Sequence, residues 1–231
     1  DDPALSYPGR DTPGLRFATE VRALLHGSCR KPHHAGGGDG LARADAHLDQ
    51  LLSGAVSETT PWPSALVLSG DQVYCDDVAG PMLRAIHGLM RRLGLREEAI
   101  AGADGSAVRC TSDLLAHPDT YYRRERLLPR TPKSERLIDL VFEGVKKPIF
   151  TTDNAHNHLI TLGEVLAMYL LAWSPLPWQG LDLSPPPGLD EENAERYASE
   201  SRAIAGFQQG LAAARRALAH LPVALVFDDH D

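Results

Sequence analysis

The chain has 231 residues, of which 43% are hydrophobic, and carries a formal net charge of −8. Its length allows a sizeable core, and its acidic balance argues against a non-specific nucleic-acid binder, which needs a basic face. No apolar run is long enough to span a bilayer, and three cysteines do not make a disulfide framework. The N-terminus shows no signal peptide and lacks an initiator Met. We therefore expect a trimmed N-terminus, and the sequence specifies neither a compartment nor an oligomeric state.

The first part of the chain predicts two strand–helix pairs. Residues 20–29 are predicted as a strand, and a glycine-rich loop follows them. Residues 41–54 are predicted as a helix, because apolar side chains recur at three- and four-residue spacing before a glycine. Residues 64–71, SALVLSGD, form a short apolar run that is typical of a buried parallel strand. A second helix with one broad apolar face is predicted over residues 82–94.

Residues 95–189 predict an irregular excursion of loops and short helices, because they hold many charges and prolines and little sustained periodicity. Within them, Thr161 and Glu164 have the spacing of a capping box, so a helix is predicted to start near Thr161. The proline-rich residues 174–188 are predicted as an extended connector.

A long helix with an apolar stripe is predicted from residue 190 until shortly before Pro222, which cannot continue it. Residues 223–227, VALVF, then predict a third short buried strand. The order of strands and helices predicts an α/β fold, with a mostly parallel sheet flanked by helices. We expect a single domain over residues 1–231.

Polar side chains follow each of the three predicted strands. The first strand runs out at Cys29, the second runs out at Asp71 with Tyr74 three residues on, and the third runs out at Asp229 and His230. Because ligands in open α/β sheets bind at the carboxyl ends of parallel strands, we expect these side chains to converge. Thiolate, phenolate and carboxylate groups are ligands that a metal holds deprotonated at neutral pH. The sequence therefore predicts a dinuclear or multinuclear metal centre suited to phosphoryl chemistry, with His230 as a proton donor to a leaving oxygen.

Three short motifs in this order resemble those of the metallophosphoesterase superfamily, and are most similar to its alkaline phosphatase D (PhoD-like) branch. The motifs are GSC, LSGDQVY and VFDDHD. In that branch a cysteine replaces the usual first motif, here Cys29, and the second motif ends on a tyrosine, here Tyr74. The resemblance implies a sandwich of two sheets flanked by helices. It also implies that the metal ligands are Cys29, Asp71, Tyr74 and Asp229, that His230 is the catalytic imidazole, and that the metals are iron and calcium.

The resemblance further implies a metal-dependent hydrolase that acts on a phosphorylated small molecule or on a phosphodiester. In the family, the third motif closes the first half of the site, and further histidines and an aspartate come from a second half. We therefore expect this chain to be the amino-terminal part of a catalytic domain, and the isolated chain to lack several ligands.

Each site residue also has a simpler interpretation. Cys29 can be a small buried apolar residue, or a thiol nucleophile paired with His33 or His34. Asp71 can be a turn residue after a glycine, and Tyr74 can be an aromatic plug over the end of the sheet. The whole chain can equally be a non-catalytic α/β interaction domain with a vestigial metal site.

Three further segments invite a ligand-binding interpretation. Arg30 and Lys31 can meet a substrate phosphate or lie on the surface, and the sequence leaves both alternatives open. The HHAGGGDG stretch lacks the Lys-Ser/Thr of a phosphate-binding loop, so a flexible loop is predicted there. The two histidines of residues 154–158 can line a pocket wall, although polar capping sequence is the favoured interpretation.

Overall fold

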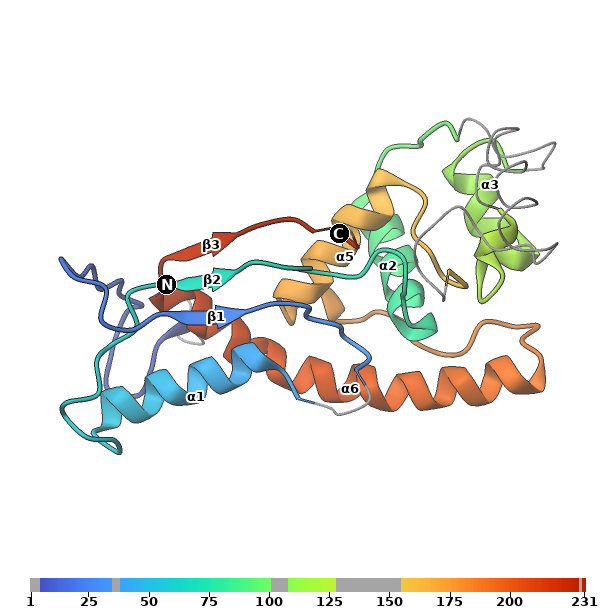
Figure 1. Ribbon diagram of the computed structural model, residues 1–231. Coiled ribbons are helices and arrows are strands. Elements are labelled where there is room, and N and C mark those ends of the chain that lie inside the picture. Colours follow the sequence, from blue (N-terminus) through green and yellow to red (C-terminus); the bar gives the residue numbers. More distant parts are fainter. Residues whose placement is uncertain (1–4, 35–37, 101–107, 128–154, 229) are drawn as a thin grey trace, which may run out of the picture. The chain divides into compact units, whose positions relative to one another are not determined.

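The computed structural model describes residues 5–34, 38–100, 108–127, 155–228 and 230–231 (Figure 1). Its internal contacts divide the chain into two compact units, which are described separately below. Unit 1 comprises Asp1–Tyr74, Leu170–Gln179 and Arg202–Asp231, and unit 2 comprises Cys75–Tyr169 and Gly180–Ser201.

Unit 1 contains a three-stranded parallel sheet in the order β1 (Leu25–Gly27), β2 (Leu66–Leu68), β3 (Val223–Leu225) (Figure 1). The strands are in register, so Gly27 lies opposite Leu68, and Leu68 lies opposite Leu225. The three carboxyl ends consequently meet at one edge of the sheet, as the sequence predicts. The α/β class with a parallel sheet is confirmed.

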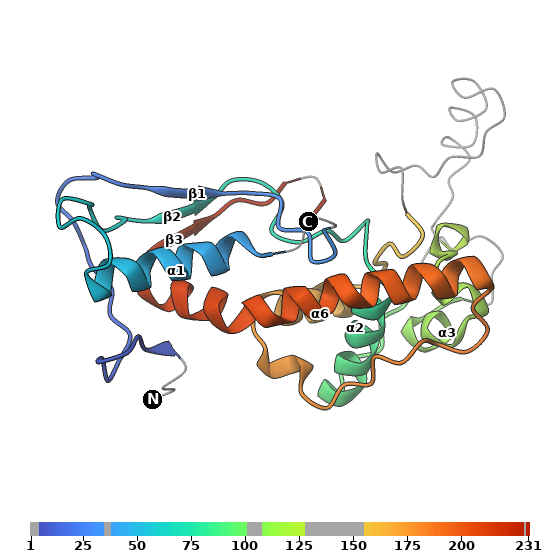
Figure 2. The ribbon, with the colours of Figure 1, turned by 90° about the horizontal axis from the view of Figure 1, so that it is seen from below.

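Two helices cover one face of this sheet, namely α1 (Gly40–Ser53) and the carboxyl-terminal part of α6 (Glu191–His220) (Figure 2). The Asp39 carboxylate accepts a hydrogen bond from the Leu41 N–H at 2.9 Å and so caps the start of α1. Gly54 ends α1 in the left-handed conformation, with φ of 73°, as predicted. Apolar side chains of the sheet and both helices form the core of unit 1: Tyr7, Leu41, Leu48, Leu66, Leu68, Ala214, Ala217 and Leu221.

The prediction that the third strand is buried is wrong. All three residues of β3 are exposed, and Leu225 is 54% exposed. An apolar run is buried only where another element covers it, and β3 is an edge strand of the described sheet. The first predicted strand is also shorter than expected, because only residues 25–27 align with the three residues of β2.

Unit 2 contains helix α2 (Gly80–Leu93), the short helix α3 (Thr111–Ala116), and the 3₁₀ turns η2 (Pro118–Thr120) and η3 (Arg124–Arg126). Helix α5 (Leu162–Trp173) begins in unit 2 and ends in unit 1, which also holds the turn η4 (Leu176–Trp178). Residues 108–127 thus follow the predicted pattern of loops and short helices, whereas residues 101–107 and 128–154 lie outside the described residues.

The predicted helix starts and apolar faces are confirmed where the structure describes them. The Thr161 N–H donates to Glu164 Oε2 at 3.1 Å, and the Glu164 N–H donates to Thr161 Oγ1 at 3.3 Å, which makes a capping box. The stripe of α6 is buried at Tyr197, Ile204 and Leu211. In the described part of the chain, every helix is too short or too polar to cross a bilayer.

The histidine-containing stretch before α5 makes structural contacts within unit 2. Asn157 Oδ1 accepts a hydrogen bond from the Tyr122 N–H at 2.7 Å, and Asn157 Nδ2 donates to the Val78 carbonyl at 2.9 Å. Asn157 thus links the backbones of Tyr122 and Val78, and the polar-capping interpretation of residues 154–158 stays a prediction, with Asn154 outside the described residues.

Gly80, the first residue of α2, is tightly packed against neighbouring side chains of unit 2. A Cβ on Gly80 would lie 2.2 Å from Tyr122 Oη and 2.8 Å from Tyr197 Cδ2, and both tyrosines are buried. Because overpacking a well-filled site costs about 1–3 kcal/mol, we expect Gly80→Ala to lower the free energy of unfolding by that amount in urea denaturation.

A second glycine in a helix provides the matched control. Around Gly206 in α6, a Cβ would meet no described atom within 4 Å. We expect Gly206→Ala to raise the free energy of unfolding by about 0.5–1 kcal/mol, because alanine favours the helix over glycine. Equal destabilisation by the two substitutions would contradict this account of Gly80.

Candidate functional site

Three of the predicted site residues lie together in unit 1, just beyond the carboxyl ends of β1 and β2. Burial raises the pKa of the Tyr74 hydroxyl above its ordinary value, and the Cys29 and then the Asp71 side chains raise it further, so both side chains lie near this hydroxyl. We call these three residues the Tyr74 cluster. The predicted convergence of a thiol, a phenol and a carboxylate is therefore present in the structure.

The backbone around Cys29 is in an unusual conformation. Cys29 has φ of 59°, in the left-handed region that non-glycine residues rarely adopt. Its side chain is exposed, and its Sγ lies 3.1 Å from Ser28 Oγ. Such backbone strain persists only where the surroundings impose it, and it is often found at functional sites. The position of Cys29 is therefore imposed by the loops around it, and the exposed thiol does not fit a buried apolar role.

The loops after β1 and β2 approach each other closely, and this contact imposes the position of Cys29. The Arg30 N–H donates to the Asp71 carbonyl at 3.2 Å. A Cβ on Gly70 would lie 1.8 Å from Ser28 Oγ and 3.5 Å from Cys29 Sγ, so only glycine fits there without a shift. The loops after β1 and β2 are thus packed against each other, which keeps the thiol close to the Asp71 carboxylate.

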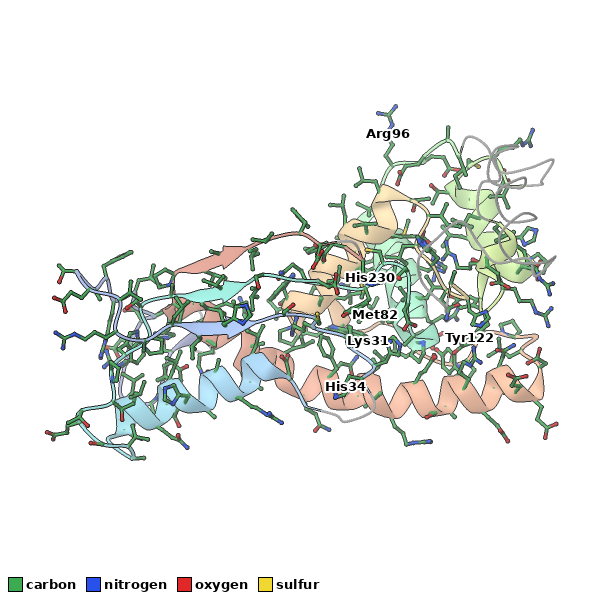
Figure 3. All side chains as sticks on the ribbon, viewed as in Figure 1. Lys31, His34, Met82, Arg96, Tyr122 and His230 are labelled. Carbon is green, nitrogen blue, oxygen red and sulfur yellow. The ribbon has the colours of Figure 1, made fainter. Side chains whose placement is uncertain are left out.

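His230 reaches the Tyr74 cluster from the segment after β3 (Figure 3). Its ring stacks on Tyr74, with centroids 5.3 Å apart and planes inclined by 28°. Its backbone N–H donates to Asp71 Oδ1 at 3.3 Å. Asp229 lies outside the described residues, so its assignment as a metal ligand stays a prediction.

Asp231 holds this third segment in place, and sequence reasoning assigned it no role. Its Oδ1 accepts hydrogen bonds from the Gln72 N–H at 2.8 Å and the Val73 N–H at 2.9 Å. Its Oδ2 accepts from the Asp228 N–H at 3.0 Å. One carboxylate therefore ties the loop after β3 to the loop after β2. The only sequence signal for it was its place in the third motif.

The two basic residues after Cys29 have different surroundings. Arg30 donates to the Asp39 carboxylate, with Nη2 and Oδ2 2.7 Å apart, and also donates to the Ala172 carbonyl. Its guanidinium also lies 4.8 Å from the ring centroids of both Trp173 and Phe207. These contacts favour a packing role for Arg30.

Lys31 instead lies close to the Tyr74 cluster (Figure 3). Its Nζ is 5.7 Å from the ring centroid of Tyr74, on the loop that leads from β1 toward α1. An ammonium group over an aromatic face is attracted by the ring quadrupole. Of the two basic residues left open by the sequence, Lys31 is therefore the one placed near the Tyr74 cluster.

The donor chemistry of the Tyr74 cluster fits a cation. Three acidic groups lie close together, and Cys29 and Asp71 make the Tyr74 hydroxyl harder to ionise, as its raised pKa indicates. A bound cation reverses this effect, because its charge favours the ionised ligands. Among the described residues, no three His, Cys, Asp or Glu side chains are placed to hold a metal ion. The third donor of this cluster is a phenol.

Comparisons with protein-family models, with curated proteins and with solved structures found no significant match to this chain. Its fold and site define it coarsely, as an α/β protein with a small parallel sheet and a cluster of acidic groups at the carboxyl edge.

Proposed function

We propose that this chain acts as a metal-dependent phosphoester hydrolase of the PhoD-like type, on phosphomonoesters or phosphodiesters. The observation that carries the proposal is the Tyr74 cluster, in which Cys29 and Asp71 lie near one phenol while His230 stacks on it. A thiol from one loop, with a phenol and a carboxylate from another, forms a set of anionic ligands rather than a set of core residues.

The proposed ligand roles follow from the chemistry of each donor. Cys29 and Tyr74 would hold the ion of higher charge, iron by resemblance, because thiolate and phenolate are strong anionic ligands. Asp71 would serve as a carboxylate ligand to both ions, the second being calcium by resemblance, which prefers oxygen ligands. Asp229 would complete the set. When bound, the ions polarise the phosphoryl group and lower the pKa of a water molecule.

The chain's other residues act on the substrate directly. His230 supplies a proton to the leaving oxygen, since an imidazole titrates near neutral pH and its ring lies against Tyr74. Lys31 contributes a positive charge beside the same ring and so attracts phosphate oxygens to the Tyr74 cluster. Arg30 acts indirectly, because its bonds to Asp39 fix the loop that carries Cys29 and Lys31.

The test is metal content together with hydrolysis of p-nitrophenyl phosphate and bis(p-nitrophenyl) phosphate. We expect Cys29→Ser to lower metal affinity by at least tenfold, since even residues that only orient ligands contribute about 10–100-fold. The matched control is Cys110→Ser, because this half-buried thiol belongs to unit 2. Full metal content in Cys29→Ser would contradict the proposal. Loss of hydrolysis on alkylation of Cys29, with the metal retained, would instead indicate a thiol nucleophile.

A second candidate function is a non-catalytic α/β interaction domain with a vestigial metal site. The exposed apolar residues at the end of β3 favour it, since Val226 is 53% and Phe227 76% exposed. Under this alternative, the well-folded chain binds no metal, and Asp71→Asn changes neither metal content nor activity.

A further inference from the structure

Unit 1 contains a cavity of about 720 Å³ that borders the Tyr74 cluster. Cys29 and Tyr74 form part of its wall, together with the loop after β1 and one side of α1. A volume in the range of about 300–1,000 Å³ is typical of pockets for small molecules. Whatever the Tyr74 cluster binds therefore has room beside it for a larger attached group.

The wall of this cavity is basic. Among the described residues that line it, Asp39 is the only acid, and its charge is matched by the bound Arg30. The remaining ionisable bases of the wall are Lys31, Arg43, His26, His34 and His47. With histidine left out, the described residues of the wall hold three bases and one acid, whereas the whole chain holds 23 bases and 31 acids.

The basic wall extends well beyond the Tyr74 cluster. Arg43 and His47 are four residues apart on α1, so both lie on the side of the helix that lines the cavity. At 1.5 Å per residue, the stretch from Gly40 to His47 is about 10 Å long. Lys31 and His34 line the cavity from the loop between β1 and α1 (Figure 3). The positive charge is therefore spread along the cavity rather than confined to the Tyr74 cluster.

We propose that this cavity binds a second anionic group, so that the substrate is a small phosphoester with another phosphate or a carboxylate. The inference rests on the proposed function for the role of the Tyr74 cluster, while the anion subsite itself is a property of the cavity. The reacting phosphoryl group lies at the Tyr74 cluster, and the second anion contacts Arg43 and His34. Arg43 can bind two oxygens at once through its planar guanidinium, which suits either kind of anion.

The test measures anion binding without any metal or turnover. The full chain is treated with a chelator, dialysed, and titrated calorimetrically with pyrophosphate. We expect saturable binding to the wild type and about tenfold weaker binding to Arg43→Gln, the loss expected for one charge-assisted contact. The matched control is Arg202→Gln, an exposed arginine of unit 1 that does not line the cavity. Circular dichroism confirms that both variants are folded.

A competition arm distinguishes the two kinds of anion. Displacement of pyrophosphate by malonate at similar concentrations assigns the subsite to carboxylates, and displacement by inorganic phosphate alone assigns it to a phosphate. Absence of saturable binding, or equal affinity of Arg43→Gln and Arg202→Gln, overturns the subsite whether or not the chain hydrolyses phosphoesters. Arg43-dependent binding in a chain that holds no metal supports the subsite and counts only against the proposed hydrolase.

Discussion

Replacing Arg124 with methionine is expected to lower the free energy of unfolding by about 3–5 kcal/mol, the usual cost of leaving a buried charge without its partner. Arg124 and Glu164 are both fully buried in unit 2. Arg124 Nη2 donates to Glu164 Oε1 at 2.8 Å and to Oε2 at 3.0 Å. Without the guanidinium, the Glu164 carboxylate would stay in the interior with no opposite charge bound to it.

The remaining partners of Glu164 are neutral. The Ile160 and Thr161 N–H groups donate to Oε2 at 2.8 and 3.1 Å, and His87 Nε2 lies 2.9 Å from Oε1. Burial lowers the pKa of His87, so its imidazole is neutral and the contact is a hydrogen bond rather than an ion pair. Since a carboxylate only accepts, Nε2 carries the proton, and Nδ1 accepts from the Tyr121 hydroxyl at 3.2 Å.

The pH dependence of the Arg124→Met effect identifies its cause. Burial acts to raise the pKa of Glu164, but Arg124 and His87 outweigh it and hold this pKa well below the ordinary value. In the wild type, Glu164 therefore stabilises the fold above its unfolded pKa of about 4.3 and loses this effect as the pH falls. In Arg124→Met, the guanidinium no longer opposes the effect of burial, so the pKa of Glu164 rises. Protonation of Glu164 as the pH falls then removes the unpaired buried charge from the variant. We expect the difference in stability to shrink between pH 7 and pH 4.

Urea denaturation of matched variants checks this prediction. Arg126→Met is the control, because Arg126 lies in the same 3₁₀ turn with its side chain 58% exposed. We expect it to change stability by no more than about 0.5 kcal/mol. The double variant Arg124→Met with Glu164→Met should be less destabilised than the sum of the single variants. If Arg124→Met and Arg126→Met changed the free energy of unfolding equally, the Arg124–Glu164 pair would not be important for stability.

The buried pair also shows what the sequence of unit 2 could and could not predict. The three-residue spacing of Thr161 and Glu164 was sufficient to predict the capping box, because that motif is local. Arg124 lies 40 residues away from Glu164, in a stretch without periodicity, and nothing local distinguishes it from an exposed arginine. Pairing of distant residues depends on how the segments pack, which a single sequence does not encode in any short pattern.

In unit 1, too, some features could be predicted from the sequence and others could not. The convergence of Cys29, Asp71 and Tyr74 was predictable, because residues that follow parallel strands in register must meet at one sheet edge. The exposure of β3 was not predictable, since hydrophobic composition does not reveal which strand lies at the edge of a sheet. Arg30 was indistinguishable from its neighbour Lys31, because the ion pair with Asp39 forms only after folding.

Under the proposed function, replacing Asp71 with asparagine is expected to abolish most phosphoester hydrolysis while leaving the fold intact. Asparagine keeps an oxygen that accepts from the His230 N–H, so this local hydrogen bond survives. It loses the negative charge and the second carboxylate oxygen that a bridging ligand needs. Because bound metals contribute several kcal/mol to catalysis, the rate should fall about a thousandfold or more.

Measuring stability as well as activity separates the loss of the Asp71 charge from a loss of structure. Urea denaturation should give Asp71→Asn a free energy of unfolding within about 1 kcal/mol of the wild type, since one buried polar group replaces another of the same shape. Asp11→Asn, an exposed position in unit 1, is the matched control and should keep both metal and activity. If Asp71→Asn binds metal and hydrolyses p-nitrophenyl phosphate as well as Asp11→Asn, the carboxylate of Asp71 is not a ligand. The Tyr74 cluster is then a hydrogen-bonded junction between two loops, and the hydrolase proposal fails with it.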